Sequence, residues 1–143
     1  MEVENSVLIA VKDLLSSRLE SMPWHDFEVE PGYHDVRGEL MVLCRQKADS
    51  EALTKVLRAE FLHDDKQVYI TNIFMPESMT QERLGKRVIR AMYEACAKHD
   101  YHLLLVDMVP SFYRRMLERG AHRIDGDSVQ ILAKTNLLDD LAK

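Results

Sequence analysis

Three cationic side chains, Arg83, Lys86 and Arg87, flank Gly85 in a polar stretch between two segments of regular pattern. The downstream pattern predicts a helix, so these cations would lie in its first turn, where they oppose the helix dipole. Helix stability therefore does not explain them. A bound phosphate or carboxylate would, because the first backbone N–H groups of a helix have no intrahelical partner. The alternative is a solvated polar loop, since one glycine before a helix is a weak signal.

The segments that flank this loop predict a strand and a helix. Residues 67–75 are rich in β-branched and aromatic side chains, and Pro76 removes the next backbone donor, so the strand is expected to end near it. From residue 84 onward, apolar side chains recur at the i, i+4 spacing of one helical face, at Leu84, Val88, Met92 and Cys96. The loop is therefore expected to place its cations just beyond the end of a strand.

The rest of the chain predicts further elements of the same domain. Amphipathic spacing predicts a helix over residues 5–19, and apolar side chains on both faces predict an interior strand over residues 36–45. The remaining elements are a short edge strand before the Pro31-Gly32 turn, a buried strand over 101–107, a last strand near 129–133 and a short terminal helix within 135–143.

The sequence does not decide between a helix and a strand for residues 50–62. Strong helix formers and apolar residues at helical spacing favour a helix. Leu57, Ala59 and Phe61 also alternate, which is the pattern of a strand. In the strand case, a hairpin through residues 63–66 would join this segment to the next strand.

Length and composition bound the class of protein. The 143 residues, of which 46% are hydrophobic, fit a single domain over residues 1–143. The net charge of −5 argues against general nucleic-acid binding, while a local basic site can still hold a small anion. No apolar run approaches the roughly 20 residues of a membrane span. Cys44 and Cys96 lie in apolar segments, and no signal-peptide pattern precedes the first helix, which predicts a cytoplasmic protein with reduced thiols.

Other chemistries find no support in the sequence. The six histidines lack metal-ligand spacing and the two cysteines have no neighbouring partner, so no metal site is predicted. The chain contains neither a Gly-x-Ser-x-Gly motif nor a Walker lysine followed by Ser or Thr, which argues against hydrolase and nucleoside-triphosphatase activities.

Two segments of the chain resemble the GNAT N-acetyltransferase superfamily. Met75-Pro76-Glu77, the polar loop and Leu84-Gly85-Lys86-Arg87-Val88-Ile89 are similar to its acetyl-CoA signature, an Arg/Gln-x-x-Gly-x-Gly/Ala loop between a strand and a helix. Gly85 matches the last small residue, whereas Thr80 replaces Arg or Gln and Arg83 replaces the first glycine. Downstream, residues 110–124 resemble the family segment in which a Phe-Tyr pair, here Phe112-Tyr113, precedes a short helix and a glycine turn. The two segments occur in the family's order.

The resemblance implies an α/β (α+β) fold with a GNAT-like mixed, mostly antiparallel central sheet flanked by helices. The strands over 67–75 and 101–107 would run parallel through a helical crossover. In the family these two strands splay apart and form the cofactor cleft. The fold is therefore expected to open at the carboxyl ends of this pair.

The resemblance also implies roles for individual residues. Backbone groups of Ile73, Phe74 and Met75 would pair with pantetheine. The phosphates of acetyl-CoA would be held by the loop and helix start: Gln81, Glu82, Arg83, Leu84, Gly85, Lys86 and Arg87. Tyr113 matches the family's acid, which protonates the departing thiolate. Asp107 is the first choice for a general base, with Glu77, Asn72 and Glu60 as further candidates.

The expected function is an acetyl-CoA-dependent N-acetyltransferase that acts on an amine of a small molecule or a protein. The alternative is a catalytically silent GNAT-like module that binds a protein partner or senses a CoA species. Thr80 and Arg83 support this alternative because they depart from the cofactor motif. The pattern does not identify the amine acceptor, and it leaves a homodimer open.

Overall fold

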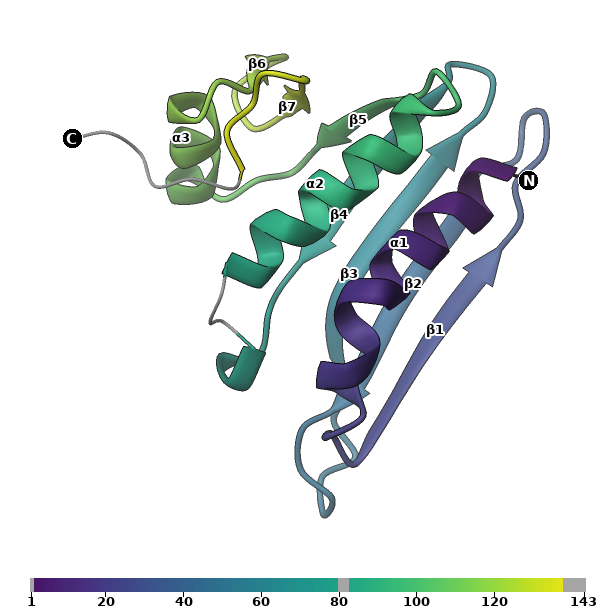
Figure 1. Ribbon diagram of the computed structural model, residues 1–143, viewed down its shortest axis with the longest axis vertical. Coiled ribbons are helices and arrows are strands. Elements are labelled where there is room, and N and C mark those ends of the chain that lie inside the picture. The colour runs from purple at the N-terminus through teal and green to yellow at the C-terminus, as the bar shows by residue number, and fades with distance from the viewer. Residues whose placement is uncertain (1, 80–82, 138–143) are drawn as a thin grey trace.

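The computed structural model describes residues 2–79 and 83–137 of the chain. These residues form one sheet with helices packed against it (Figure 1). The helices are α1 (Glu2–Leu19), α2 (Leu84–Ala97) and α3 (Pro110–Glu118), with a 3-10 turn, η1 (Glu77–Met79), ahead of α2. The strands are β1 (Trp24–Glu30), β2 (Gly38–Arg45), β3 (Thr54–Leu62), β4 (Gln67–Ile73), β5 (His102–Leu105), β6 (His122–Arg123) and β7 (Val129–Ile131).

The topology of the sheet confirms the expected fold class. The strands lie in the order β1-β2-β3-β4-β5-β7-β6. Neighbouring strands run antiparallel except β4 and β5, which run parallel and are joined by α2 as a crossover helix. The sheet is thus mixed and mostly antiparallel, and the parallel pair adjoins the loop that carries the cations.

The main core lies between the sheet and the two longer helices. α1 and α2 lie side by side over one face of the sheet, as Figure 1 shows. The side chains of Leu57, Ala59 and Phe61 in β3 are fully buried. Arg58 and Glu60 alternate with them and remain partly exposed. This part of the sheet therefore has one packed face and one polar face, as antiparallel sheets commonly do.

Residues 54–62 form a strand, so the helical interpretation of this segment is wrong. β3 pairs with β2 along one edge and with β4 along the other, and it is joined to β4 by the expected hairpin. Two sets of interstrand hydrogen bonds and the burial of alternate side chains outweigh a helix propensity that amounts to a few tenths of a kcal/mol per residue.

Other expected elements are confirmed with shifted ends. α1 begins at Glu2, β2 begins at Gly38 and β4 ends at Ile73. Of the terminal helix expected within 135–143, residues 135–137 are not helical and residues 138–143 lie outside the described ranges. Across residues 2–79 and 83–137, no helix combines the length and apolar character needed to cross a membrane.

A buried polar cluster fixes the end of the sheet opposite the carboxyl end of β4. The carboxylate of Glu4 in α1 accepts a hydrogen bond from Gly32 N at 2.7 Å and lies 3.2 Å from His63 Nε2. The other ring nitrogen of His63 is hydrogen-bonded to Tyr101 Oη at 2.7 Å. A Cβ at Gly38 would collide with Glu4 Oε2 and would lie 2.8 Å from the backbone nitrogen of Gly32, so the close approach of the two backbones requires glycine here. The cluster thus ties α1 to three loops of the sheet.

Candidate functional site

The parallel pair of strands opens at its carboxyl end. Pairing between β4 and β5 runs from Gln67 and His102 to Ile70 and Leu105, and Val106 N then donates to Ile70 O at 3.1 Å. β4 continues beside β3 to Ile73, whereas β5 ends at Leu105. A cleft of about 150 Å³ lies here, lined by residues 70–73 of β4, residues 105–109 after and within β5, and Phe112 of α3.

A β-bulge in β4 accompanies this opening. Ile70 pairs with Ala59 and Asn72 with Arg58, so Thr71 is the extra residue on the β4 side. A bulge bends the strand that carries it and increases its twist. The bend in β4 therefore coincides with the point at which pairing to β5 ends.

The three residues expected to bind pantetheine differ in their backbone contacts. Phe74 N donates to Val56 O at 2.8 Å, so the amide of Phe74 is engaged with the β3 side. Backbone groups of successive residues in a strand point to opposite edges, which directs those of Ile73 toward the cleft. The side chain of Met75 packs against the start of α2, where a Cβ at Gly85 would lie 3.5 Å from Met75 Cγ.

The loop residues expected to hold phosphates fall into three groups. Gln81 and Glu82 lie outside the described residues. Leu84 is fully buried in the core, and Arg87 lines a separate groove between α1 and α2 of about 530 Å³. Arg83, Gly85 and Lys86 lie at the start of α2, where Arg83 adopts left-handed backbone geometry with φ 56°. Of the residues expected to hold phosphates, these last three are the ones that the structure places at the start of α2, outside the core and the α1–α2 groove.

The side chains of Arg83 and Lys86 belong to a group of four cations. Arg115 and Arg119, which follow β5 in and just after α3, complete this cationic cluster of Arg83, Lys86, Arg115 and Arg119. Burial lowers the pKa of Lys86, and the charges of Arg119, Arg115 and Arg83 lower it further. Burial and the charges of Arg83 and Arg115 likewise lower the pKa of Arg119. The four charges therefore lie close enough to repel one another.

Two contacts relate the cationic cluster to the strands and the helix that border the cleft. On the α2 side, Gly85 adjoins Met75, which follows β4. On the α3 side, the Arg115 guanidinium lies 5.9 Å from the ring centroid of Phe112, which lines the cleft. Sequence reasoning gave no role to Arg115 or Arg119. Their spacing of four residues, on a helix that follows the second strand of the parallel pair, is the signal that could have identified them.

The expected acid, Tyr113, is not among the residues that line the cleft, whereas its neighbour Phe112 is. Tyr113 Oη donates a hydrogen bond to the backbone carbonyl of Asp125 at 2.6 Å. This bond ties α3 to the turn between β6 and β7. The catalytic role of Tyr113 stays a prediction, and in this geometry its proton is directed at a carbonyl.

The candidates for a general base lie in different surroundings. Asp107 is exposed, lines the cleft and has left-handed backbone geometry with φ 54°. Asn72 also lines the cleft, but its amide donates to Lys55 O. Burial would raise the pKa of Glu60, yet hydrogen bonds from Arg37 and Arg58 outweigh it and the pKa is lowered. Glu77 is exposed in η1. Asp107 is the carboxylate positioned at the cleft.

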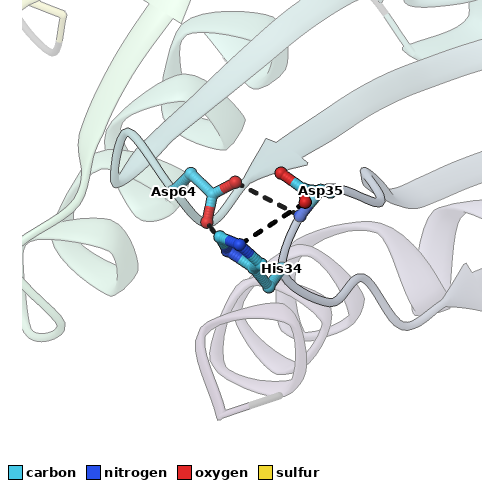
Figure 2. A group of neighbouring side chains, drawn as sticks. All are labelled: His34, Asp35 and Asp64. Carbon is cyan, nitrogen blue, oxygen red and sulfur yellow. Dashed lines mark hydrogen bonds and ion pairs between the residues drawn. The ribbon is translucent and has the colours of Figure 1, made fainter.

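A second group of polar side chains joins two turns beyond the C-terminal end of β3, away from the cleft. His34 and Asp35 lie in the β1–β2 loop, and Asp64 lies in the β3–β4 turn (Figure 2). His34 Nδ1 is hydrogen-bonded to Asp64, and Asp35 N donates to the same carboxylate at 3.2 Å. The side chains of His34 and Asp35 are 81% and 79% exposed. These contacts show that the group links the two turns at the surface. We assign no metal to it.

The described residues thus form a narrow cleft between two parallel strands, with a cationic cluster beyond its end. The cleft is lined by backbone and side chains of the two strands, and the cations attract anionic groups. Arg and Lys side chains are the usual partners of phosphate, and the first turn of α2 adds backbone N–H groups. Comparisons of the chain with family models, curated proteins and solved structures found no match.

Proposed function

We propose that this protein is an N-acetyltransferase of the GNAT type that transfers the acetyl group of acetyl-CoA to an amine of a small molecule or a protein. The observation that carries the proposal is the opening of β4 from β5 after Ile70, with the cationic cluster beyond it. The pantetheine arm is thin and extended, so it suits a cleft between strands. The phosphates of the coenzyme are anionic and suit the cluster.

In this proposal, the cleft holds the thioester end of the pantetheine arm, and the surface holds the nucleotide. A cleft of about 150 Å³ has room for the narrow thioester end only. The backbone of Ile73 would pair with pantetheine amides in the manner of an added strand. Arg83 and Lys86 from α2 would meet the phosphates from one side, and Arg115 and Arg119 from the other. Contacts from side chains would then replace the close backbone approach that a glycine at position 83 would permit.

The reaction requires a neutral amine, which attacks the thioester carbonyl and displaces the thiolate of CoA. A base must take a proton from the amine and an acid must protonate the thiolate. Asp107 is the proposed base, acting directly or through water, because its carboxylate is exposed at the cleft. Tyr113 is the proposed acid. Its hydroxyl would have to exchange its bond to the Asp125 carbonyl for one to the thiolate.

A catalytically silent CoA-binding module is the second candidate, and two observations favour it. The hydroxyl of Tyr113 donates to a backbone carbonyl, and Arg83 stands where the family motif has glycine. The Tyr113→Phe variant separates the two functions once turnover is measured with a panel of amines. The enzyme predicts lower turnover at unchanged cofactor affinity, since only the proton donor is removed. Turnover equal to that of the parent protein would exclude Tyr113 from the mechanism.

Calorimetric titration with acetyl-CoA, with free CoA as the control, tests the site itself. Micromolar affinity for acetyl-CoA supports the proposal and justifies a search for the acceptor. Absence of heat at millimolar acetyl-CoA would refute both the enzyme and the CoA-binding module. A cytoplasmic location, where acetyl-CoA is available, belongs to the same proposal and can be checked by cell fractionation.

A further inference from the structure

β1 is an edge strand, and one side of its backbone has no neighbouring strand among the described residues. Along its other side it pairs with β2, from Trp24 opposite Arg45 to Glu30 opposite Glu39. Figure 1 shows it as the outermost strand of the sheet. Backbone groups of successive residues in a strand point to opposite edges, so about half of the N–H and C=O groups of β1 are directed outward. They form a template for one more strand.

One face of β1 carries a row of acids. Asp26, Glu28 and Glu30 are spaced two residues apart, so strand geometry places their side chains on the same face. We call these three residues the acidic row. Glu39 of β2 lies directly opposite Glu30, and like charges at such positions are destabilising. A hydrogen bond with the carboxyl of Asp26 is the main cause that raises the pKa of Glu28, and the neighbouring negative charges raise it further. The edge of the sheet is therefore strongly negative on this face.

The acidic row has no cation of its own. In the ion-pair network of the next two strands, Glu39 pairs with Arg58 at 2.7 Å. Within residues 2–79 and 83–137, by contrast, no lysine or arginine forms an ion pair with a carboxylate of the row. Two of the three acids are exposed, and the third, Asp26, is partly buried. The row can therefore receive cations from a partner.

The residues that alternate with the acids leave an apolar face incompletely covered. Phe27 and Val29 pack against the core but stay partly buried. A strand added beside β1 with cations opposite the acids would place its intervening side chains next to Phe27 and Val29. Trp24, two residues before the row and 37% exposed, offers its ring to a further cation. The edge thus selects a segment in which cations alternate with apolar residues.

We propose that the free edge of β1 binds an extended segment of another protein in which lysine or arginine alternates with apolar residues. The segment adds one strand to the sheet through backbone hydrogen bonds, and its cations lie opposite the acidic row. A second copy of this chain is a poorer occupant, because antiparallel pairing of two β1 strands would bring both acidic rows together on one face. β2 and β3 separate this edge from the cleft between β4 and β5, so the inference does not depend on the proposed function.

Titration of the full-length protein with synthetic peptides is the test. The probe is Lys-Val-Lys-Val-Lys-Val-Lys, which is capped at both ends and has the length of β1, and the control has glutamate in place of lysine. In calorimetry we expect binding of the lysine peptide, with an affinity that falls as salt rises, and no binding of the control. Absence of binding by the lysine peptide would overturn the proposal.

Hydrogen–deuterium exchange distinguishes an added strand from attraction between charges. With the lysine peptide bound, exchange of the amides in residues 24–30 should slow, because the outward-directed N–H groups of β1 gain acceptors. Binding that leaves this exchange unchanged would overturn the proposal. A dimer of the protein alone that protects the same amides would assign the edge to a second copy and would overturn it as well.

Two charge-matched variants locate the binding. The first replaces all three acids of the acidic row by their amides and should weaken peptide binding by about tenfold or more. It should be at least as stable as the parent protein, because it removes charges that repel one another. The second, Glu20→Gln with Asp49→Asn and Glu51→Gln, removes the same number of exposed acids outside β1 and should bind like the parent. Equal losses in both variants would show that net charge alone attracts the peptide and would refute the assignment to β1.

Discussion

Arg58 and Arg119 are both partly buried arginines, yet their surroundings shift the guanidinium pKa in opposite directions. For Arg58, burial lowers the pKa, but hydrogen bonds to Glu60 and Glu39, at 2.7 Å each, outweigh it and the pKa is raised. For Arg119, burial and the neighbouring cations act together, and the pKa is lowered. The polar face of the sheet alternates positive and negative charges, whereas the cationic cluster gathers positive ones.

The difference shows which charges serve the fold. In the network on β2 and β3, Arg37 adds a further bond to Glu60, so each charge lies next to an opposite one. Such a network holds strands in register. In the cationic cluster, Arg119 Nη1 donates to the backbone carbonyl of Asn136 at 3.0 Å, but the repulsion among the four charges works against folding. Positions that violate the rules of stable structure are expected at functional sites, so this contrast makes the cationic cluster a candidate ligand site.

The largest effect is expected from a negative charge placed inside the cationic cluster. Gly85→Glu should abolish acetyl-CoA binding in calorimetry, because a carboxylate would occupy the position of the phosphates. The added Cβ lies 3.5 Å from Met75 Cγ, an ordinary contact. Replacing glycine in a helix and adding an acid to its first turn each contribute up to about 1 kcal/mol of stability. The melting temperature should therefore rise while binding is lost.

Ala97→Glu provides the matched control for this variant. Ala97 is exposed at the last residue of α2, so the same side chain and charge are added at the other end of the same helix. Its affinity for acetyl-CoA should equal that of the parent protein. Retained binding by Gly85→Glu would show that the anion site lies elsewhere.

A smaller effect is expected when the ion-pair network loses its central cation. Arg58→Met keeps much of the aliphatic stem but removes the bonds to Glu39, Glu60 and the Thr71 hydroxyl. We expect the free energy of unfolding to fall by about 1–2 kcal/mol, as measured by urea denaturation. Cofactor affinity should change little. An unchanged urea midpoint would mean that the network contributes nothing to stability and would remove the contrast with the cationic cluster.

The smallest effect is expected for Lys86→Met, which removes one of the mutually repelling charges. We expect this variant to be as stable as the parent protein or more stable by about 0.5 kcal/mol. The pKa of Lys86 is lowered from 10.5 in the folded protein, so the folded state binds fewer protons than the unfolded state just below that pH. Stability of the parent should therefore rise with pH across this alkaline window relative to the variant. A parallel pH dependence of the two proteins would contradict this.

Prediction from the sequence was most reliable where one pattern acted alone. The spacing of Val88, Met92 and Cys96 predicted α2, and no strand pattern competed with it. Pro76 predicted the end of the preceding strand, which the structure places at Ile73. Prediction was undecided at residues 50–62, where helix propensity and alternation disagree within one segment. Pairing partners decided that segment, and they lie on other parts of the chain.

The candidate site was predicted in part for the same reason. Lys86 and Arg83 could be identified because a cation in the first turn of a helix opposes the dipole, which is visible in a linear sequence. Arg115 and Arg119 could not, because their meaning depends on facing Lys86 across space. The hydrogen bond of Tyr113 to the Asp125 carbonyl was equally hidden, since it joins a helix to a turn.

The sequence by itself determined the elements whose cause is local: the amphipathic α2, the strand that stops before Pro76 and a cationic helix start. Tertiary structure alone decided the identity of β3, the bulge at Thr71 that coincides with the opening of β4 from β5, and the meeting of four cations that lie in or next to α2 and α3. The physical reason is that periodicity and helix dipoles act within a few residues along the chain. Strand pairing, burial and charge repulsion depend on which distant residues the fold brings together.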